Sequence, residues 1–278
     1  MAYDFRDNEY TFKHIAEEHP EQNTDLFTEH FHTSYELLYF LRGRGEFIIQ
    51  QNTYEVKPHN LLVIRPGDYH NLLLNSRSWY ERIVLRFSTT DIPPEFHSQL
   101  ACSQPVYNVR GTRLEEELKR LAILHQDLNN NLILPVMKNQ LNIILAYLCQ
   151  CSQLSVTATQ SNPTVERIIT YISENLTTIH SIDQIADNLR MSRSLLQKRF
   201  YQHLQTPVMS YVRTQKCILA QELLTRGEPA TSCYLDCGFN DYSSFYRSYL
   251  KVFGHPPTSP KPRKKPPKEP APPPHQPS

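Results

Sequence analysis

A pattern that returns after 49 residues constrains the fold of this 278-residue chain more than any other feature of the sequence. In each copy, a residue that can cap a helix N-terminus precedes three apolar residues spaced four positions apart. Apolar residues at that spacing share one face of an α-helix, so each copy predicts a helix with one buried stripe and one exposed polar face. The first copy consists of Ser192, Leu196, Phe200 and Leu204, and the second of Asp241, Phe245, Tyr249 and Phe253.

A second short helix is predicted just before the first copy. The stretch "SIDQIADNL" begins with Ser181, another capping residue, and two residues separate it from Ser192. The small side chain of Ala186 allows two helices to cross closely, and Met191 can fill the turn. The pair therefore predicts a helix-turn-helix motif, with a plain helical hairpin as the alternative.

The exposed faces of the two copies suit a nucleic acid, because the first contains no acidic residue and both offer hydrogen-bonding groups. A solvated surface helix is the alternative. In the first copy, Arg193 and Gln197 are expected at base edges and Lys198 at a phosphate. A helix over residues 207–225, about 28 Å long, would hold the two copies in successive major grooves, whose repeat is about 34 Å. The DNA-contacting residues predicted are Arg193, Ser194, Gln197, Lys198, Tyr201, Ser243, Tyr246 and Arg247.

Three separated stretches give the C-terminal part a family resemblance. "SIDQIADNLRMSRSLLQKRF", "YVRTQKCILAQELL" and "CGFNDYSSFYRSYLKVFG" are similar to the DNA-binding domain of the AraC/XylS family, over about residues 163–258. The resemblance implies a bacterial transcription regulator, often an activator that contacts RNA polymerase. Four positions depart from the family pattern: Tyr234 replaces a small alanine, Leu250 replaces a basic residue, and Pro260 with Lys261 replaces an aromatic-arginine pair. The bulky Tyr234 is expected to push the second helix pair apart, and Leu250 to remove a phosphate contact.

Short apolar or alternating stretches separated by turn residues run from residue 35 to residue 87, and they predict an antiparallel barrel or sandwich. "HFHTSYE" and "RPGDYH" resemble the two cupin motifs, with Arg65 in place of a proline. Three imidazoles and a carboxylate could bind a first-row transition metal. Similar residues in the regulator family, however, line a barrel that binds an effector without metal. We therefore expect no metal or other cofactor, and we expect a small-molecule effector such as a sugar to contact His30, His32, Glu36 and His70.

Two further helices are predicted from apolar residues that alternate at intervals of four and three. The first runs through Leu114, Leu118, Leu121, His125 and Leu128, and the second through Met137, Leu141, Ile144, Leu148 and Cys151. This spacing is typical of one helix packing against another. The stripes can cover the barrel of their own chain or form the contact of a homodimer, and periodicity does not distinguish the two.

Together these features predict an α+β multidomain protein, with an N-terminal antiparallel cupin-like β-barrel plus two helices and a C-terminal all-α domain with two helix-turn-helix motifs. The expected division is an effector-binding and dimerisation domain at 1–151, a polar linker at 152–164, a DNA-binding domain at 165–258 and a disordered proline-rich tail at 259–278. Residues 1–160 contain 14 Lys and Arg against 19 Asp and Glu, whereas residues 161–278 contain 15 against 9, which favours anion binding by the C-terminal half.

The sequence also indicates where in the cell the protein is expected and which functional class it belongs to. Six cysteines without a CxxC pair are expected to be reduced thiols. No secretory signal and no apolar run long enough for a bilayer are visible, so a cytoplasmic protein without membrane contact is expected. The predicted function is that of a sequence-specific DNA-binding transcriptional regulator, not an enzyme, acting as a homodimer on double-stranded DNA. The alternative is a metal-dependent cupin enzyme with a helical appendage.

Overall fold

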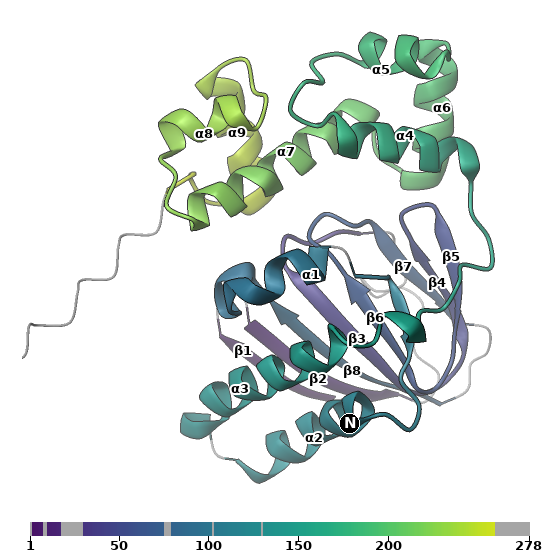
Figure 1. Cartoon of the computed structure of the whole chain (residues 1–278), viewed down its shortest axis with the longest axis vertical. Helices are drawn as coiled ribbons and strands as arrows, with labels where there is room; N and C mark the ends of the chain where they lie inside the picture. Colours follow the sequence, from purple (N-terminus) through teal and green to yellow (C-terminus); the bar gives the residue numbers. More distant parts are fainter. Residues whose placement is uncertain are drawn as a thin grey trace, which may run out of the picture.

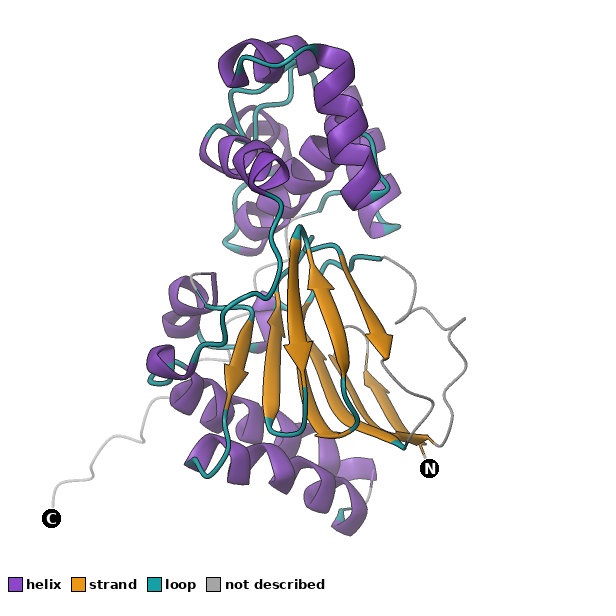
Figure 2. Cartoon of the chain, turned by 90° about the vertical axis from the view of Figure 1, so that its right-hand side faces the viewer, coloured by secondary structure: helices purple, strands orange, loops and turns teal. Residues whose placement is uncertain are grey.

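Strands with alternating side chains form two antiparallel sheets in the N-terminal part of the chain. The computed structural model describes residues 2–7, 10–17, 30–74, 79–101, 103–128 and 130–258. The larger sheet has the strand order β1-β2-β8-β3-β6-β9, and the smaller has β5-β4-β7. The strands are β1 Ala2–Asp7, β2 Tyr10–Glu17, β3 Tyr35–Arg42, β4 Gly45–Ile49, β5 Asn52–Val56, β6 Asn60–Ile64, β7 His70–Leu74, β8 Tyr80–Phe87 and β9 Val106–Asn108. Figure 2 shows them in orange. The predicted antiparallel class is confirmed in this two-sheet form.

Six strands between residues 35 and 87 lie where the alternation predicts them, but the β1–β2 hairpin and β9 were not predicted. Tyr10 and Phe12 alternate along β2 and are buried, which is the period-two signal that could have identified this strand. The proline-rich tail predicted at 259–278, with Pro260 and Lys261, lies outside the described residues.

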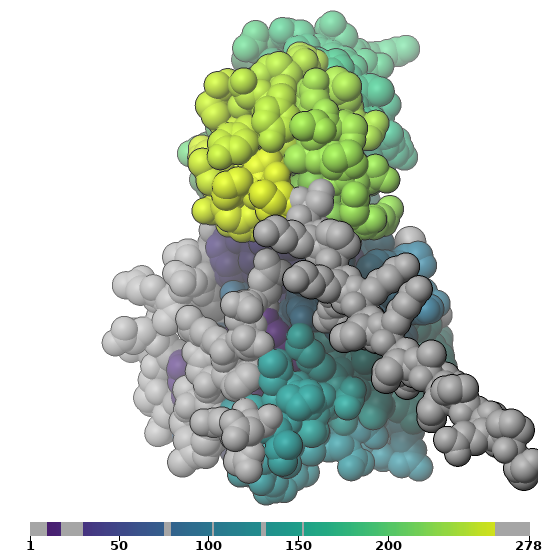
Figure 3. Space-filling model, turned by 90° about the vertical axis from the view of Figure 1, so that its left-hand side faces the viewer, coloured from purple at the N-terminus to yellow at the C-terminus, as the bar shows by residue number. Residues whose placement is uncertain are grey.

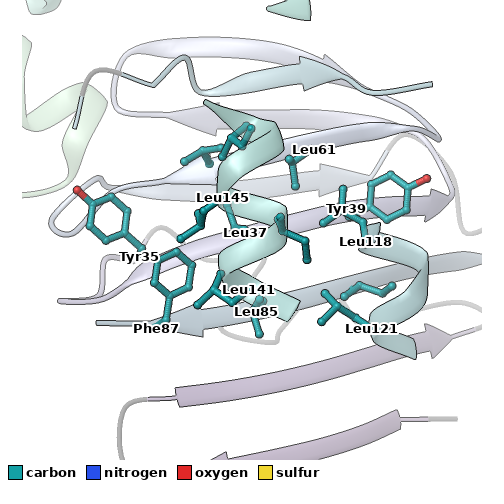
Figure 4. Close-up of a cluster of buried hydrophobic side chains, with 14 of the residues drawn as sticks. Tyr35, Leu37, Tyr39, Leu61, Leu85, Phe87, Leu118, Leu121, Leu141 and Leu145 are labelled. Atoms are coloured by element: carbon teal, nitrogen blue, oxygen red, sulfur yellow. The ribbon is translucent and has the colours of Figure 1, made fainter. Parts of the chain in front are cut away.

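Strand β3 in the middle of the larger sheet has buried side chains on both faces. Leu38 and Phe40 point toward the smaller sheet and join a core with Phe47 and Leu72. Side chains of the opposite face, including Leu37, pack against two helices. Figure 4 shows this second core, where sheet residues meet Leu118, Leu121, Leu141 and Leu145 of the helices.

The two helices of the second core are α2 Arg113–Asp127 and α3 Asn130–Leu148. Their apolar stripes resolve the alternative that the sequence left open. Leu114, Leu118 and Leu121 of α2 and Met137 and Leu141 of α3 are almost fully buried within the chain itself. The stripes therefore cover the larger sheet of their own chain and are not available for contact with a second chain. Short helical turns, η1 Thr89–Asp91, η2 Pro94–Phe96 and α1 His97–Ala101, follow β8.

The C-terminal part is helical, as predicted. Its helices are α4 Pro163–Glu174, α5 Ile182–Leu189, α6 Arg193–Leu204, α7 Val208–Thr225, α8 Ala230–Asp236 and α9 Tyr242–Phe253. The predicted caps are present: the side chains of Ser181, Ser192 and Asp241 accept hydrogen bonds from backbone N–H groups of the first turns of α5, α6 and α9. Gly254 ends α9 with φ +75°, a left-handed conformation that glycine adopts without strain. Figure 1 shows α7 joining the two helix pairs.

The part from β1 to α3 is called the sheet domain below, and the part from α4 to α9 the helical domain. The segment that connects the two domains, residues 152–162, is called the connecting segment. It lies along the sheet domain, because Val156 N–H donates to Val106 O and Thr53 N–H donates to Gln160 O. Figure 1 shows the helical domain seated on one end of the sheets, and Figure 3 shows its surface, green to yellow, above that of the sheet domain. Among the described residues, no helix combines the length and the apolar character needed to cross a bilayer. Five cysteines, Cys149, Cys151, Cys217, Cys233 and Cys237, are free thiols.

Candidate functional site

The first candidate surface is the outer face of α6. Leu196, Phe200 and Leu204 are fully buried in the core of the first helix pair, so the rest of the helix faces outward. The predicted contact residues are exposed or half-buried, and the ring of Tyr201 is 47% exposed. A surface hollow of about 700 Å³ is lined by Arg193, Ser194, Gln197 and three neighbours. The face is thus accessible to a partner, since none of the residues that the structure describes covers it.

One ion pair on this face is weak. The Arg193 guanidinium lies 3.5 Å from the Asp183 carboxylate of α5, and both side chains are more than half exposed. An exposed pair of this length contributes little to stability. Arg193 can therefore leave Asp183 for a phosphate or a base edge at small cost.

The second candidate surface is the outer face of α9. Phe245 and Tyr249 are fully buried, while Ser243 and Arg247 are exposed and Tyr246 is half-buried. Leu250 adds an exposed apolar side chain to this face. Tyr234, the residue expected to push the helix pair apart, is half-buried and packs with its ring on those of Tyr242 and Phe245 of α9.

A lysine that sequence reasoning missed joins the two helix pairs. Lys216 of α7 is buried, and its ammonium group donates to the carbonyl oxygens of Ile179 and Gly238, each at 2.6 Å. Burial lowers the pKa of Lys216. Gly238 has φ +77°, and a Cβ there would lie 1.8 Å from Thr177 O, so the backbones of the two pairs touch. No spacing rule identifies such a residue, because a lysine in a helix is usually a surface residue.

The third candidate site lies between the two sheets, at the end nearest the helical domain. Glu36 of β3 and His70 at the start of β7 are buried, and His32 precedes β3. His32 Nε2 lies 3.2 Å from Glu36 Oε2, and potential ligand atoms of His32, Glu36 and His70 lie within 4.8 Å of one another. His30 pairs with His70 through backbone hydrogen bonds, and their ring centroids are 4.3 Å apart. The structure therefore brings together the four residues predicted to contact an effector.

The electrostatics of this cluster depend on one buried carboxylate. Burial by itself would raise the pKa of Glu36, but His32, Arg86 and His70 around it hold the pKa well below its usual range. Arg86 of the neighbouring strand β8 donates to Glu36, with which it is paired in register. Burial lowers the pKa of His70 to about 4. The cluster is thus a carboxylate, a neutral imidazole and a second imidazole in a water-poor site.

Two contacts at the backbone of Gly67 dock the sheet domain against α7. Gln215 Nε2 donates to Gly67 O at 3.1 Å. Gly67 has φ +79°, and a Cβ there would lie 2.4 Å from Ile218 Cδ1. The loop that carries Gly67, residues 65–69, was identified from sequence as part of a cupin motif, and its contact with the helical domain was not foreseen.

A polar network continues this docking contact. Gln50 Nε2 donates to Asp68 Oδ1 at 2.9 Å and to the Tyr211 hydroxyl of α7 at 3.3 Å. The rings of Tyr69 and Tyr211 lie 6.0 Å apart, and burial raises the pKa of Tyr211. Arg65 forms an ion pair with Asp68 at 3.1 Å. A cavity of about 390 Å³ beside the network is lined by residues of both domains.

Comparisons with known proteins agree with both halves of this architecture. A family model described as an AraC-like ligand binding domain matches residues 14–128, and a helix-turn-helix domain model matches residues 185–261. The transcriptional activator RhaR of Escherichia coli O1:K1 is 23% identical over 257 residues, which cover 88% of this chain and 89% of RhaR. Among solved structures, ToxT of Vibrio cholerae has a TM-score of 0.38 and 14% identity, and covers 90% of this chain and 97% of its own. The DNA-binding domain of AdpA, solved with a target DNA, has a TM-score of 0.32 and 22% identity over 35% of this chain and 87% of its own.

Proposed function

The chain belongs to the AraC/XylS family of transcriptional regulators, and from that membership we propose that it activates transcription by binding two adjacent half-sites in double-stranded DNA. The observation that carries this proposal is the pair of uncovered polar faces on α6 and α9. Each face is backed by a buried apolar stripe, and the two are held together by α7 and Lys216. At 18 residues, α7 is about 27 Å long, which suits two helices in neighbouring turns of the major groove.

We assign roles to side chains by their chemistry. Arg193 and Gln197 offer the bidentate donors and acceptors that distinguish base edges, while Lys198 is a point charge suited to a phosphate. Ser194 and Tyr201 flank them on α6. On α9 the corresponding contacts fall to Ser243, Tyr246 and Arg247, and Leu250 in place of a basic residue leaves this second motif with fewer phosphate contacts.

The test compares two substitutions on α6. Gln197→Ala should relax the preference for one base pair by about 1–3 kcal/mol, because a base contact is lost. Lys198→Ala should weaken binding to all sequences alike and reduce the slope of log affinity against log salt by about one unit. Binding is measured by fluorescence anisotropy on operator fragments selected from random DNA. Gln126→Ala, on the exposed end of α2, serves as the control and should change neither quantity. Identical base preferences and salt slopes in all three variants would contradict the assignment.

We propose that the sheet domain contains the effector site, formed by His30, His32, Glu36 and His70 between the two sheets. Its match to an AraC-like ligand binding domain supports this role. A cupin enzyme finds no support in the matched models, which describe a ligand-binding and a DNA-binding domain. A small polar molecule such as a sugar is the proposed class of effector, and equilibrium dialysis against candidate sugars tests it. Loss of binding in His70→Ala but not in His14→Ala is expected.

We also propose that the protein is a homodimer in the cytoplasm, where the DNA lies. Its proposed division is an effector-binding and dimerisation domain at 1–151, a linker at 152–164 and a DNA-binding domain at 165–258. Because the inner stripes of α2 and α3 are occupied, we place the dimer contact on the outer faces of these helices. Ile123 and Ile143 are exposed there and support such a contact. Sedimentation should show a dimer that Ile143→Glu weakens. A contact with RNA polymerase completes the proposal, and transcription with purified polymerase tests it.

The docking contact between the domains supports a route from effector to DNA. The loop at residues 65–69 contacts α7, the helix that holds both DNA-binding motifs. An effector that shifts this loop changes how the helical domain is docked. Coupling of this kind is reciprocal, so DNA should change the effector's affinity by the same factor as the effector changes that of DNA.

A further inference from the structure

The cluster between the sheets has the features of a metal site. We infer that His32, Glu36 and His70 together bind one divalent first-row transition metal ion. Two imidazole nitrogens and one carboxylate oxygen converge here, within 4.8 Å of one another. Sequence alone favoured effector contact without metal, and the geometry of the three side chains reverses that preference.

The hydrogen bonds of the two histidines leave the correct nitrogens available. His32 Nδ1 lies 2.7 Å from Ser34 O, and His70 Nδ1 lies 2.8 Å from Asp68 O. A carbonyl oxygen can only accept, so each Nδ1 carries the proton, and in a neutral imidazole the Nε2 lone pair is then free to bind a metal. Ligating histidines are oriented in this way by their second nitrogen in known metal sites.

Both free nitrogens are buried without a hydrogen-bond donor. Among the described residues, His70 Nε2 has no hydrogen-bond partner, and His32 Nε2 faces an oxygen that can only accept, Glu36 Oε2 at 3.2 Å. A protonated His32 could form an ion pair with Glu36, but that would still leave His70 Nε2 unsatisfied. One cation among the three groups satisfies both nitrogens and the carboxylate at once.

The chemistry of the ligand set points to the class of metal. Two histidines and one carboxylate bind zinc or iron(II) and leave positions open for water or a small molecule. Ca²⁺ and Mg²⁺ prefer sites made of oxygen ligands. Arg86, which pairs with Glu36 from the next strand, orients the carboxylate. His30, whose ring lies beside that of His70, is the nearest candidate for a fourth ligand.

The site is also connected to the docking contact, and this part of the inference rests on the proposed function. His70 Nδ1 is bonded to Asp68 O, and the Asp68 carboxylate accepts from Gln50, which donates to Tyr211 of α7. An ion that fixes the His70 ring therefore fixes the loop at residues 65–69 against α7. The metal ion, alone or with a bound small molecule, is then a signal that reaches the DNA-binding domain.

The site is tested by titrating the chelator-treated full-length protein with Co²⁺, followed by visible absorption, and with Zn²⁺ in competition. One ion per chain should bind, with a cobalt spectrum typical of nitrogen and oxygen ligands. His70→Ala should lower the affinity by about 100-fold or more, beyond the loss caused by changes around a metal site. His32→Ala, at the most exposed of the three positions, should do the same with less risk to folding.

The matched control is His59→Ala, because His59 also faces a carboxylate, that of Glu115, but belongs to no three-residue ligand group among the described residues. This variant should bind metal like the wild type. The emission of Trp79, the chain's single tryptophan, and circular dichroism verify the fold of each variant. Absence of saturable binding of both ions, or equal losses in the His59 variant, would overturn the metal site.

The regulatory part is tested by DNA affinity with and without Zn²⁺. We expect a change of about fivefold or more, and DNA should change the Zn²⁺ affinity by the same factor. Equal DNA affinities in a protein that binds Zn²⁺ would overturn the regulatory part and leave the site in place. Failure to bind DNA at any salt concentration would instead overturn the proposed function, while the cobalt titration would still decide the metal site.

Discussion

At the residue scale, the buried carboxylate of Glu115 shows how one side chain ties the sheet domain together. It accepts hydrogen bonds from the Tyr39 hydroxyl at 2.8 Å, from His59 Nδ1 at 2.6 Å and from Gly111 N–H at 2.7 Å, and it pairs with Lys119 at 2.8 Å. Burial by itself would raise the pKa of Glu115, but Lys119 and the other donors lower it to about 2. Strand β3, the β5–β6 turn and helix α2 thus meet at one ionised group.

This depressed pKa predicts how stability depends on pH. A folded-state pKa of about 2 against an ordinary value of 4.5 means that the ionised group stabilises the fold above about pH 4.5, by about 3 kcal/mol at most. That contribution is lost as the pH falls from 4.5 through 2, because the unfolded chain then binds more protons. Urea unfolding followed by Trp79 emission should therefore show a steeper fall in unfolding free energy for the wild type than for Glu115→Gln. Parallel pH profiles for the two proteins would rule out this role.

At the element scale, the relation between the two DNA-binding motifs depends on α7 and on the Lys216 bridge. The ammonium group of Lys216 contacts the turn before α5 and the turn between α8 and α9 at the same time. A helix alone would fix the distance between the motifs but would leave their mutual rotation to weaker contacts. The bridge therefore serves as a positioning device for α6 and α9.

Lys216→Met should loosen this positioning. The substitution keeps the length of the side chain but leaves two buried carbonyl oxygens without a donor, at about 1–3 kcal/mol each. We expect a lower melting temperature of the helical domain and a reduced ability to distinguish the natural spacing of two half-sites from one lengthened by one base pair. Anisotropy titrations on both DNA fragments measure this ratio. Lys251→Met, at an exposed position on α9, is the control and should keep the wild-type ratio.

The elements that sequence predicted are those with local signals. The bounds of α5, α6 and α9 follow from caps at Ser181, Ser192 and Asp241 and from apolar spacing, all within a few residues of the helix itself. The partner surface of the α2 and α3 stripes could not be predicted, because periodicity shows that a face is buried and not what buries it. The Lys216 bridge is likewise invisible, because Ile179 and Gly238 are 37 and 22 residues away.

The cluster of His32, Glu36 and His70 between the sheets falls between these cases. The spacing of His32 and Glu36 is local, and it was recognised as a motif. The position of His70 beside His32 and Glu36 depends on how the two sheets pack and on the bridge between His30 and His70, which a single sequence does not predict. The tautomers that leave both Nε2 atoms free depend on backbone carbonyls at Ser34 and Asp68, and these follow from loop geometry. The residue types thus identified the candidate site residues. Only the tertiary structure shows that they lie close together and which ring nitrogens face the site.

At the scale of the whole molecule, the proposed route from effector to DNA depends on contact between the sheet domain and the helical domain. One contact between them is at Gly67, where a Cβ would meet the side-chain ends of Ile218 and Gln215 of α7. Gly111 provides a matched position, because its φ of +74° is similar to the +79° of Gly67 and nothing lies within 4 Å of its Cβ position. The two glycines therefore share backbone strain on substitution and differ in what surrounds them.

Gly67→Gln should separate the two domains, whereas Gly111→Gln should cause the strain of a positive φ alone. A glutamine side chain at residue 67 would displace the side-chain ends of Ile218 and Gln215, so the hydrogen bond from Gln215 to the loop and the nearby contact of Tyr211 should weaken. Small-angle X-ray scattering should show a larger maximum dimension for the Gly67 variant, and elastase should cleave the connecting segment at residues 152–162 faster. DNA should still bind, but the reciprocal effect of effector or Zn²⁺ on DNA affinity should disappear. If the Gly67 variant opened and nevertheless kept that reciprocal effect, the signal would have to travel through the connecting segment and not through the docked loop.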